Sequence, residues 1–235
     1  MIILGIETSA VSAGAALLVD GKIVSETYIN SGLTHSQTLM CLIDTALNNA
    51  GIAFSDVNAV AVAAGPGSFT GIRIGVSAVK GLCFSENKPC FPVSTLEALA
   101  NCAALEEYVI CPVMDARCKQ VYTAMFEMKE GHVERIKEDM PLSVDDLSNE
   151  LLRMNRKVLL VGDGTDVTYG TLVANGVDVV KFPEVFKYQR ACGVAIAAFK
   201  RYNKGETGIS ADKLVPSYLR LSQAERELKN RSCEK

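Results

Sequence analysis

The sequence predicts an α/β protein made of two similar halves, each with a mixed sheet flanked by helices. Apolar runs of strand length alternate with longer segments of helical periodicity. The same order of strands, acidic residue, helix and glycine turn occurs twice, with Glu7 matching Asp115 and Gly65 matching Gly162. A length of 235 residues, 49% of them hydrophobic, is enough for two small cores.

The chain is predicted to open with three antiparallel strands, over residues 2–6, 13–19 and 23–29. Asp20-Gly21 favours a tight hairpin between the last two strands, because both residues tolerate positive φ. A helix then begins in the motif Thr34-His35-Ser36-Gln37, which fits a capping box, and it stops at Gly51. Apolar residues recur at helical spacing between these two signals.

The rest of the first half is predicted as a strand over 57–64, a glycine-rich turn over 65–71, a helix over 72–84 and an extended segment over 91–93. Ser94 and Glu97 fit a second capping box, for a helix that ends near residue 104. A polar cap followed by an apolar helical stretch is typical of a helix start.

The second half is predicted to repeat the plan, with strands over 108–114, 120–128, 132–137 and 158–161 and helices over 144–153, 166–174 and 189–202. Ser143 is the expected cap of the first of these helices. We expect an N-terminal lobe over 1–105 and a C-terminal lobe over 106–215. The tail over 216–235 is expected to pack back on the first lobe.

Composition and charge exclude several classes of protein. The net charge of −3 is unlike the basic character of a dedicated nucleic-acid binder. No apolar run is long enough to span a bilayer, and the first residues lack the basic start of a signal peptide, so a cytoplasmic protein is expected. With two histidines and eight cysteines that form no C-x-x-C pair, we expect reduced, buried thiols, no metal site and no cofactor.

Two strand ends and one turn are candidates for a cleft between the halves. Glu7 and Asp115 would hold a magnesium ion for nucleotide chemistry, or each would cap a turn, and the second interpretation is favoured. The turn over 65–71 would cradle an anion or would be only a tight connection, and its spacing leaves both open. The residues assigned to a vestigial nucleotide cleft are Glu7, Ser9, Asp115, Arg117, Gly65 and Gly67.

The helix over 72–84 is apolar on most of its surface and is rich in glycine. Gly71 and Gly75 lie four residues apart, on one face, and Gly81 follows. Glycine weakens a helix by up to about 1 kcal/mol relative to alanine, so its retention indicates close approach by another element. A partner helix pair would cover such a helix; burial inside this chain is the alternative.

Several motifs together resemble the TsaB family, also called YeaZ, along the chain from Ile3 to about Arg220. They are Gly65-Pro66-Gly67-Ser68-Phe69-Thr70-Gly71-Ile72-Arg73-Ile74-Gly75, which is highly specific, and the supporting Ile6-Glu7-Thr8-Ser9, Thr34-His35-Ser36-Gln37, Met114-Asp115-Ala116-Arg117 and Pro216-Ser217-Tyr218-Leu219-Arg220. The resemblance implies a duplicated RNase H-like, actin-like (ASKHA) fold with two lobes of mixed five-stranded sheets.

The resemblance also implies a role in forming N6-threonylcarbamoyladenosine at position 37 of tRNAs that read ANN codons. It implies a scaffold that dimerises with the paralogue TsaD, supports docking of the ATPase TsaE, pairs as a homodimer when alone, and meets tRNA only through the complex. This chain lacks the His-x-x-x-His metal pair of TsaD, so a non-catalytic subunit is expected. A stand-alone phosphotransferase or peptidase-like enzyme of the same superfamily is the alternative.

By the same resemblance, the partner surface lies on the helix pair near residues 35–47 and 72–84. The residues assigned to it are His35, Leu39, Leu42, Ile43, Ala46, Ile72, Gly75, Ala78, Val79 and Leu82.

Overall fold

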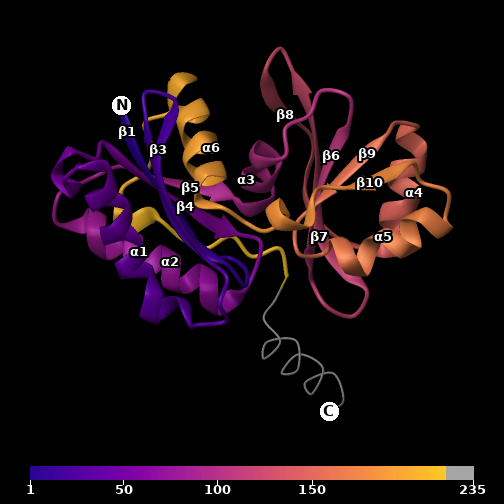
Figure 1. Cartoon of the computed structure of the whole chain (residues 1–235), viewed down its shortest axis with the longest axis horizontal. Helices are drawn as coiled ribbons and strands as arrows, with labels where there is room; N and C mark the ends of the chain where they lie inside the picture. Colours follow the sequence, from indigo (N-terminus) through magenta and orange to yellow (C-terminus); the bar gives the residue numbers. More distant parts are fainter. Residues whose placement is uncertain (221–235) are drawn as a thin grey trace.

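Two five-stranded mixed sheets form the centres of two lobes in the computed structural model, which describes residues 1–220 (Figure 1). The first sheet contains β1 (Ile2–Glu7), β2 (Ala13–Val19), β3 (Lys22–Ile29), β4 (Ala59–Gly65) and β5 (Cys90–Ser94). The second contains β6 (Val109–Asp115), β7 (Gln120–Lys129), β8 (His132–Ser143), β9 (Val158–Val161) and β10 (Val179–Lys181).

The strand orders confirm the predicted duplication. The first sheet runs β3-β2-β1-β4-β5, and the second, read from its other edge, runs β8-β7-β6-β9-β10. In each sheet the first three strands pair antiparallel and the remaining two pair parallel. The two hairpins turn at Asp20-Gly21 and Glu130-Gly131, where all four residues have positive φ.

The α-helices are α1 (His35–Ala50), α2 (Phe69–Phe84), α3 (Thr95–Cys102), α4 (Val144–Met154), α5 (Thr165–Ala174) and α6 (Ala191–Asn203). Short 3-10 turns are η1 (Phe54–Asp56), η2 (Glu184–Phe186) and η3 (Ala211–Lys213). The local signals explain most boundaries: the hydroxyls of Ser94 and Ser143 accept hydrogen bonds from the third following amides, as predicted. Gly51 ends α1 in the left-handed conformation, with φ of 65°.

The capping box predicted at Thr34 is wrong. Thr34 is the residue before α1, but its side chain makes no capping hydrogen bond. The amide of Gln37 donates instead to the backbone oxygen of Thr34, at 3.0 Å. The motif therefore predicts the correct start of the helix, but the hydrogen-bond acceptor there is the backbone carbonyl of Thr34 and not its hydroxyl.

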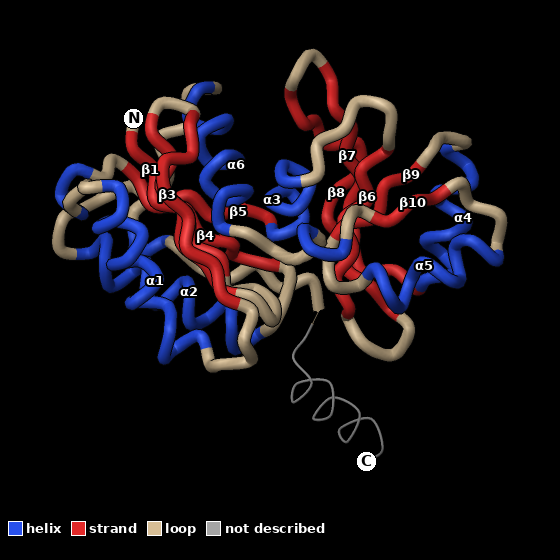
Figure 2. Tube along the Cα trace, viewed as in Figure 1, coloured by secondary structure: helices blue, strands red, loops and turns tan. Residues whose placement is uncertain are grey.

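Helices cover both faces of each sheet, as Figure 2 shows. The core under α1 and α2 joins Leu39, Ile43, Ile72 and Val79 to strand residues such as Leu4. On the opposite face, α6 packs on β1, β2 and β5, and α3 lies between the lobes, where its other side packs on the second sheet. Helices α4 and α5 cover the outer face of the second sheet.

The limits of 1–105 and 106–215 for two lobes stay a prediction about folding units. In the packing, α6 lies on the first sheet although it is C-terminal in the sequence. The segment that follows it also returns to the first lobe: Ile209 pairs with Cys90, and the amide of Ser217 donates to Ala64 O at 2.7 Å. The tail therefore packs on the first lobe as far as Tyr218, whereas Arg220 Nη1 donates to Ala116 O of the second lobe at 3.4 Å. The rest of the predicted tail lies outside the described residues.

Candidate functional site

Glu7 ends β1 with its side chain buried between the lobes. The amide of Ser9 donates to Glu7 Oε1 at 2.5 Å, which closes a small turn. Among the described residues, Glu7 Oε2 has no hydrogen-bond partner, and neither does the hydroxyl of Ser9, which is also buried. Burial raises the pKa of Glu7 to about 7, from an ordinary value of 4.5, because the charged carboxylate is deprived of water.

Asp115 repeats this turn at the end of β6 in a different environment. The amide of Arg117 donates to Asp115 Oδ1 at 2.7 Å, but the carboxylate is exposed to solvent. Arg117, Cys118 and Lys119 all have positive φ, between 54° and 64°. Each acid therefore accepts a hydrogen bond that closes the turn after its strand. Within residues 1–220 there is no group of three or more metal-ligating side chains.

A further acid, which the sequence reasoning did not select, lies between these two turns. Burial raises the pKa of Asp163, which follows β9 and is close enough to interact electrostatically with both Glu7 and Asp115. The side-chain amide of Gln189 donates to Asp163 Oδ1 at 2.7 Å, and Ser12 Oγ donates to the backbone oxygen of Gln189 at 2.9 Å. In the sequence, only the glycine turn Gly162-Asp163-Gly164 pointed to Asp163 as a site residue, and no pattern pointed to Gln189.

The glycine-rich turn is filled by the chain itself. A Cβ on Gly65, where φ is 130°, would lie 2.2 Å from Ser217 O, and one on Gly67, where φ is 155°, would lie 2.3 Å from Ser9 O. The amide of Ser68 donates to Ser9 O at 2.7 Å. These contacts support a tight connection, since an anion at this turn would have to displace Ser9.

The glycines of α2 also have their close neighbour inside the chain. A Cβ on Gly71 would lie 2.1 Å from Thr8 O, and one on Gly75 would lie 2.3 Å from Thr8 Oγ1. Thr8 Oγ1 in turn donates to Gly71 O at 2.8 Å. The predicted close approach by another element is confirmed, and of the two alternatives burial inside this chain applies here: Gly71 and Gly75 let α2 approach the connection between β1 and β2.

Most of the residues assigned to the partner surface face inward. Those buried in the first lobe are Leu39, Ile43, Ala46, Ile72, Gly75 and Val79, and those half-buried are His35, Leu42, Ala78 and Leu82. These six pack toward the first sheet, and of them only Leu39 also reaches the open surface between α1 and α2. His35 is held from inside as well, because its Nε2 donates to Ala10 O at 2.7 Å.

An open groove nevertheless runs between the outward sides of α1 and α2. It has a volume of about 520 Å³ and is lined by Ser36, Leu39, Met40, Thr70, Arg73, Ile74, Ser77 and Ala78. Met40 is 44% exposed on its rim. Of the residues assigned from sequence, only Leu39 and Ala78 line this groove. For the other residues of the groove, the only indication in the sequence was that Met40 widens the apolar face of its helix.

One end of the groove is built by the returning chain. The rings of Phe69 and Tyr218 stack with their centroids 4.4 Å apart, and Arg73 Nε donates to the Tyr218 hydroxyl at 2.8 Å. The guanidinium of Arg73 lies within 6 Å of both rings. Residues near 218 therefore fix the exposed arginine at the groove. Within the described residues, no helix is both long enough and apolar enough to cross a membrane.

Comparisons with known proteins give a consistent result. The family model described as "TsaD: tRNA N6-adenosine threonylcarbamoyltransferase" matches residues 26–228. The Bacillus subtilis tRNA threonylcarbamoyladenosine biosynthesis protein TsaB is 33% identical over 227 residues, which are 96% of this chain and 96% of that protein. The B. subtilis tRNA N6-adenosine threonylcarbamoyltransferase is 29% identical over 64% of this chain and 47% of its own length.

Among solved structures, YeaZ from Pseudomonas aeruginosa is similar with a TM-score of 0.77 and 26% identity. The match covers 93% of this chain and 99% of that one. The duplicated two-sheet architecture expected from the sequence is thereby confirmed as the YeaZ fold.

Proposed function

Because this chain belongs to the TsaB family of tRNA threonylcarbamoyladenosine biosynthesis proteins, we propose that it acts as a non-catalytic partner subunit in the formation of N6-threonylcarbamoyladenosine. Position 37 of tRNAs that read ANN codons is the proposed target. The chain would dimerise with a TsaD-like paralogue, support docking of a TsaE-like ATPase, and contact tRNA only through the complex.

The observation that carries this proposal is the groove between α1 and α2. Its floor and rim combine apolar groups, such as Met40 and Ile74, with the small residues Ser77 and Ala78, so another helix can approach closely. The exposed ring of Phe84 extends the apolar surface at the end of α2. Figure 1 shows both helices on the outer side of the first lobe, away from the second.

A paralogue of similar fold is the proposed occupant because it would offer an equivalent helix pair. Related subunits commonly pair through the same patch about a two-fold axis, so each groove receives the helix of the other. The TsaD-type enzyme is also similar in sequence to 64% of this chain. In the absence of that partner, a second copy of this chain would occupy the groove as a homodimer.

The filled interlobe turn supports the non-catalytic part of the proposal. Gly67 packs against Ser9 O, and Glu7 Oε1 is used by its own turn. A nucleotide phosphate would have to displace these contacts. The alternative, a stand-alone phosphotransferase or peptidase-like enzyme, requires that displacement and binding by the isolated chain, and calorimetry with ATP and magnesium tests it.

Co-purification with the TsaD-like paralogue tests the interface. Ala78→Glu places a charge in the groove, where a docked partner would remove it from water, so we expect affinity to fall at least about tenfold, or ~1.4 kcal/mol. Thr45→Glu is the matched control, since Thr45 is exposed on α1 and does not line the groove. Equal affinity of both variants and the unmodified chain would remove the groove from the interface.

A second measurement separates the interface from the pathway. Depletion of the protein in cells should lower N6-threonylcarbamoyladenosine in digested tRNA, and the Thr45→Glu variant should restore it. Undiminished nucleoside after complete depletion would contradict the role itself, whatever the binding data show.

A further inference from the structure

Two cysteines meet where α3 contacts α6. Cys102 is the last residue of α3 and Cys192 is the second residue of α6, and their sulfur atoms are 3.8 Å apart. Both side chains are partly exposed. The sulfurs would have to approach to about 2.05 Å to bond.

Gly193 makes room for this contact. A Cβ at Gly193 would lie 2.7 Å from Cys102 Sγ and 2.2 Å from Ala98 O. The start of α6 is held in place from the other side, because Glu26 accepts hydrogen bonds from the amide of Cys192 at 3.1 Å and from Arg190 Nη2. The two thiols are therefore held close together by the backbone packing.

The other described cysteines differ from this pair. Cys83, Cys90 and Cys111 are buried, and Cys41 and Cys118 are exposed. The prediction of eight buried thiols is thus wrong for four of the seven that the structure describes. A solvent oxidant can reach Cys102 and Cys192, and each has its reaction partner in contact.

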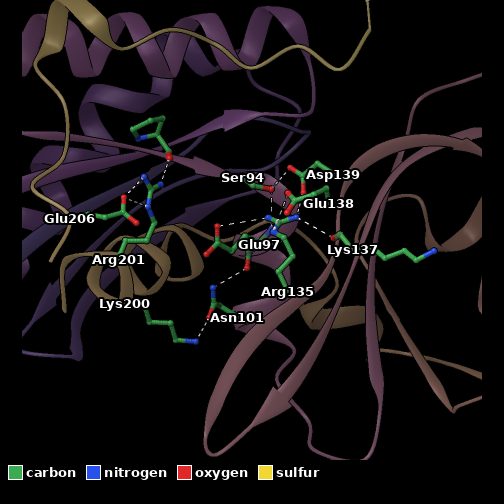
Figure 3. A network of polar contacts seen from close by, with 11 residues as sticks. Ser94, Glu97, Asn101, Arg135, Lys137, Glu138, Asp139, Lys200, Arg201 and Glu206 are labelled. Carbon is green, nitrogen blue, oxygen red and sulfur yellow. Dashed lines mark hydrogen bonds and ion pairs between the residues drawn. The ribbon is translucent and has the colours of Figure 1, made fainter. Parts of the chain in front are cut away.

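Helix α3 connects the two lobes, as the polar network in Figure 3 shows. Ser94, at its start, donates to Asp139 of β8 at 2.5 Å, and Glu97 lies 4.0 Å from Arg135 of the same strand. On its other side, Asn101 accepts a hydrogen bond from Lys200 of α6 at 2.6 Å. A covalent bond between α3 and α6 would therefore add to the contacts that hold the lobes together.

We propose that Cys102 and Cys192 form a reversible disulfide under peroxide, which locks α3 to α6. One thiolate attacks a peroxide oxygen, the O–O bond breaks, and a sulfenic acid and hydroxide form. The second thiol attacks the sulfenic sulfur, the S–S bond forms, and water leaves. In sum, two thiols and hydrogen peroxide give one disulfide and two waters, with two electrons passing from sulfur to oxygen.

The test treats the full chain, in a Cys41→Ser, Cys118→Ser background, with hydrogen peroxide, followed by thiol blocking and peptide mass mapping. We expect a cross-linked peptide pair containing Cys102 and Cys192, a loss of two hydrogen atoms, and reversal by a dithiol. The melting temperature should rise on the order of 5 °C on oxidation, because the bond closes a long loop.

Cys192→Ser is the matched variant, since a hydroxyl replaces the thiol at nearly the same size. It should keep the reduced protein's melting temperature and lose the rise on oxidation. Oxidation of Cys102 to sulfinic acid without cross-linking, or an equal rise in the Cys192→Ser variant, would overturn the proposal.

Discussion

Glu7 gives the most quantitative prediction because its carboxyl group is fully buried and one of its oxygens has no partner among the described residues. Its pKa is raised from 4.5 to about 7 by burial, so the folded protein holds a proton that the unfolded chain releases. Stability from this group is fully present below pH 4.5 and is lost as the pH rises toward 7. A rise of the pKa from 4.5 to about 7 corresponds to about 3 kcal/mol.

Glu7→Gln removes the titration and keeps the shape. The side-chain oxygen of the substituted glutamine can still accept the hydrogen bond from the Ser9 amide, and its neutral amide group replaces the protonated Oε2. We therefore expect the variant and the unmodified chain to have similar free energies of unfolding near pH 4.5. At about pH 8 the variant should be more stable by about 3 kcal/mol.

Urea unfolding at several pH values measures this difference. Asp115→Asn is the control, because Asp115 forms the same kind of turn with an exposed carboxylate, and surface changes are usually worth less than about 0.5 kcal/mol. If the advantage of the Glu7→Gln variant did not grow between acid and alkaline pH, Glu7 would have to be hydrated or paired in the folded protein. The interpretation of the interlobe turn would then fail.

Two further predictions concern α2. Gly75→Ala should destabilise the chain by about 1–3 kcal/mol in urea unfolding, because its Cβ would lie 2.3 Å from Thr8 Oγ1. Gly81→Ala is the control and should be neutral or stabilising, because no described atom lies within 4 Å of the added Cβ. Tyr218→Ala should lower the free energy of unfolding in urea by about 1 kcal/mol, because it removes the ring that stacks on Phe69. Tyr218→Phe keeps the ring and should retain most of this stability. Equal losses in the two variants would assign the effect to the hydroxyl.

Most of the local structure and the duplication could be predicted from the sequence. Alternating apolar runs, the caps at Ser94 and Ser143 and the stop at Gly51 depend on neighbouring residues, and the structure confirms each of them. Strand β10 was missed because its three residues, of which two are exposed, show no periodicity. Its existence depends on pairing with β9, which is a tertiary contact.

The site could be predicted only in part, because periodicity finds an apolar face without showing what covers it. Ile43 and Val79 looked available to a partner, yet the first sheet covers them. The location of α6 was equally hidden: Gly5 has no side chain, and a Cβ there would lie 2.6 Å from Ala191 O, so the helix packs on β1 from far along the chain. Such long-range contacts leave no local pattern.

Helix α2 is apolar on nearly all sides, and the structure explains this pattern side by side. Gly71 and Gly75 hold one side of the helix against Thr8, and this close approach fixes which side remains outward. The outward side presents Ile74 and Ala78 to the groove. The first lobe buries Ile72, Val76 and Val79 and partly covers Ile74 and Ala78, whereas Phe84 remains 77% exposed. If a partner enters between α1 and α2 as proposed, substitutions in the groove should affect association, whereas substitutions at the glycines should affect folding.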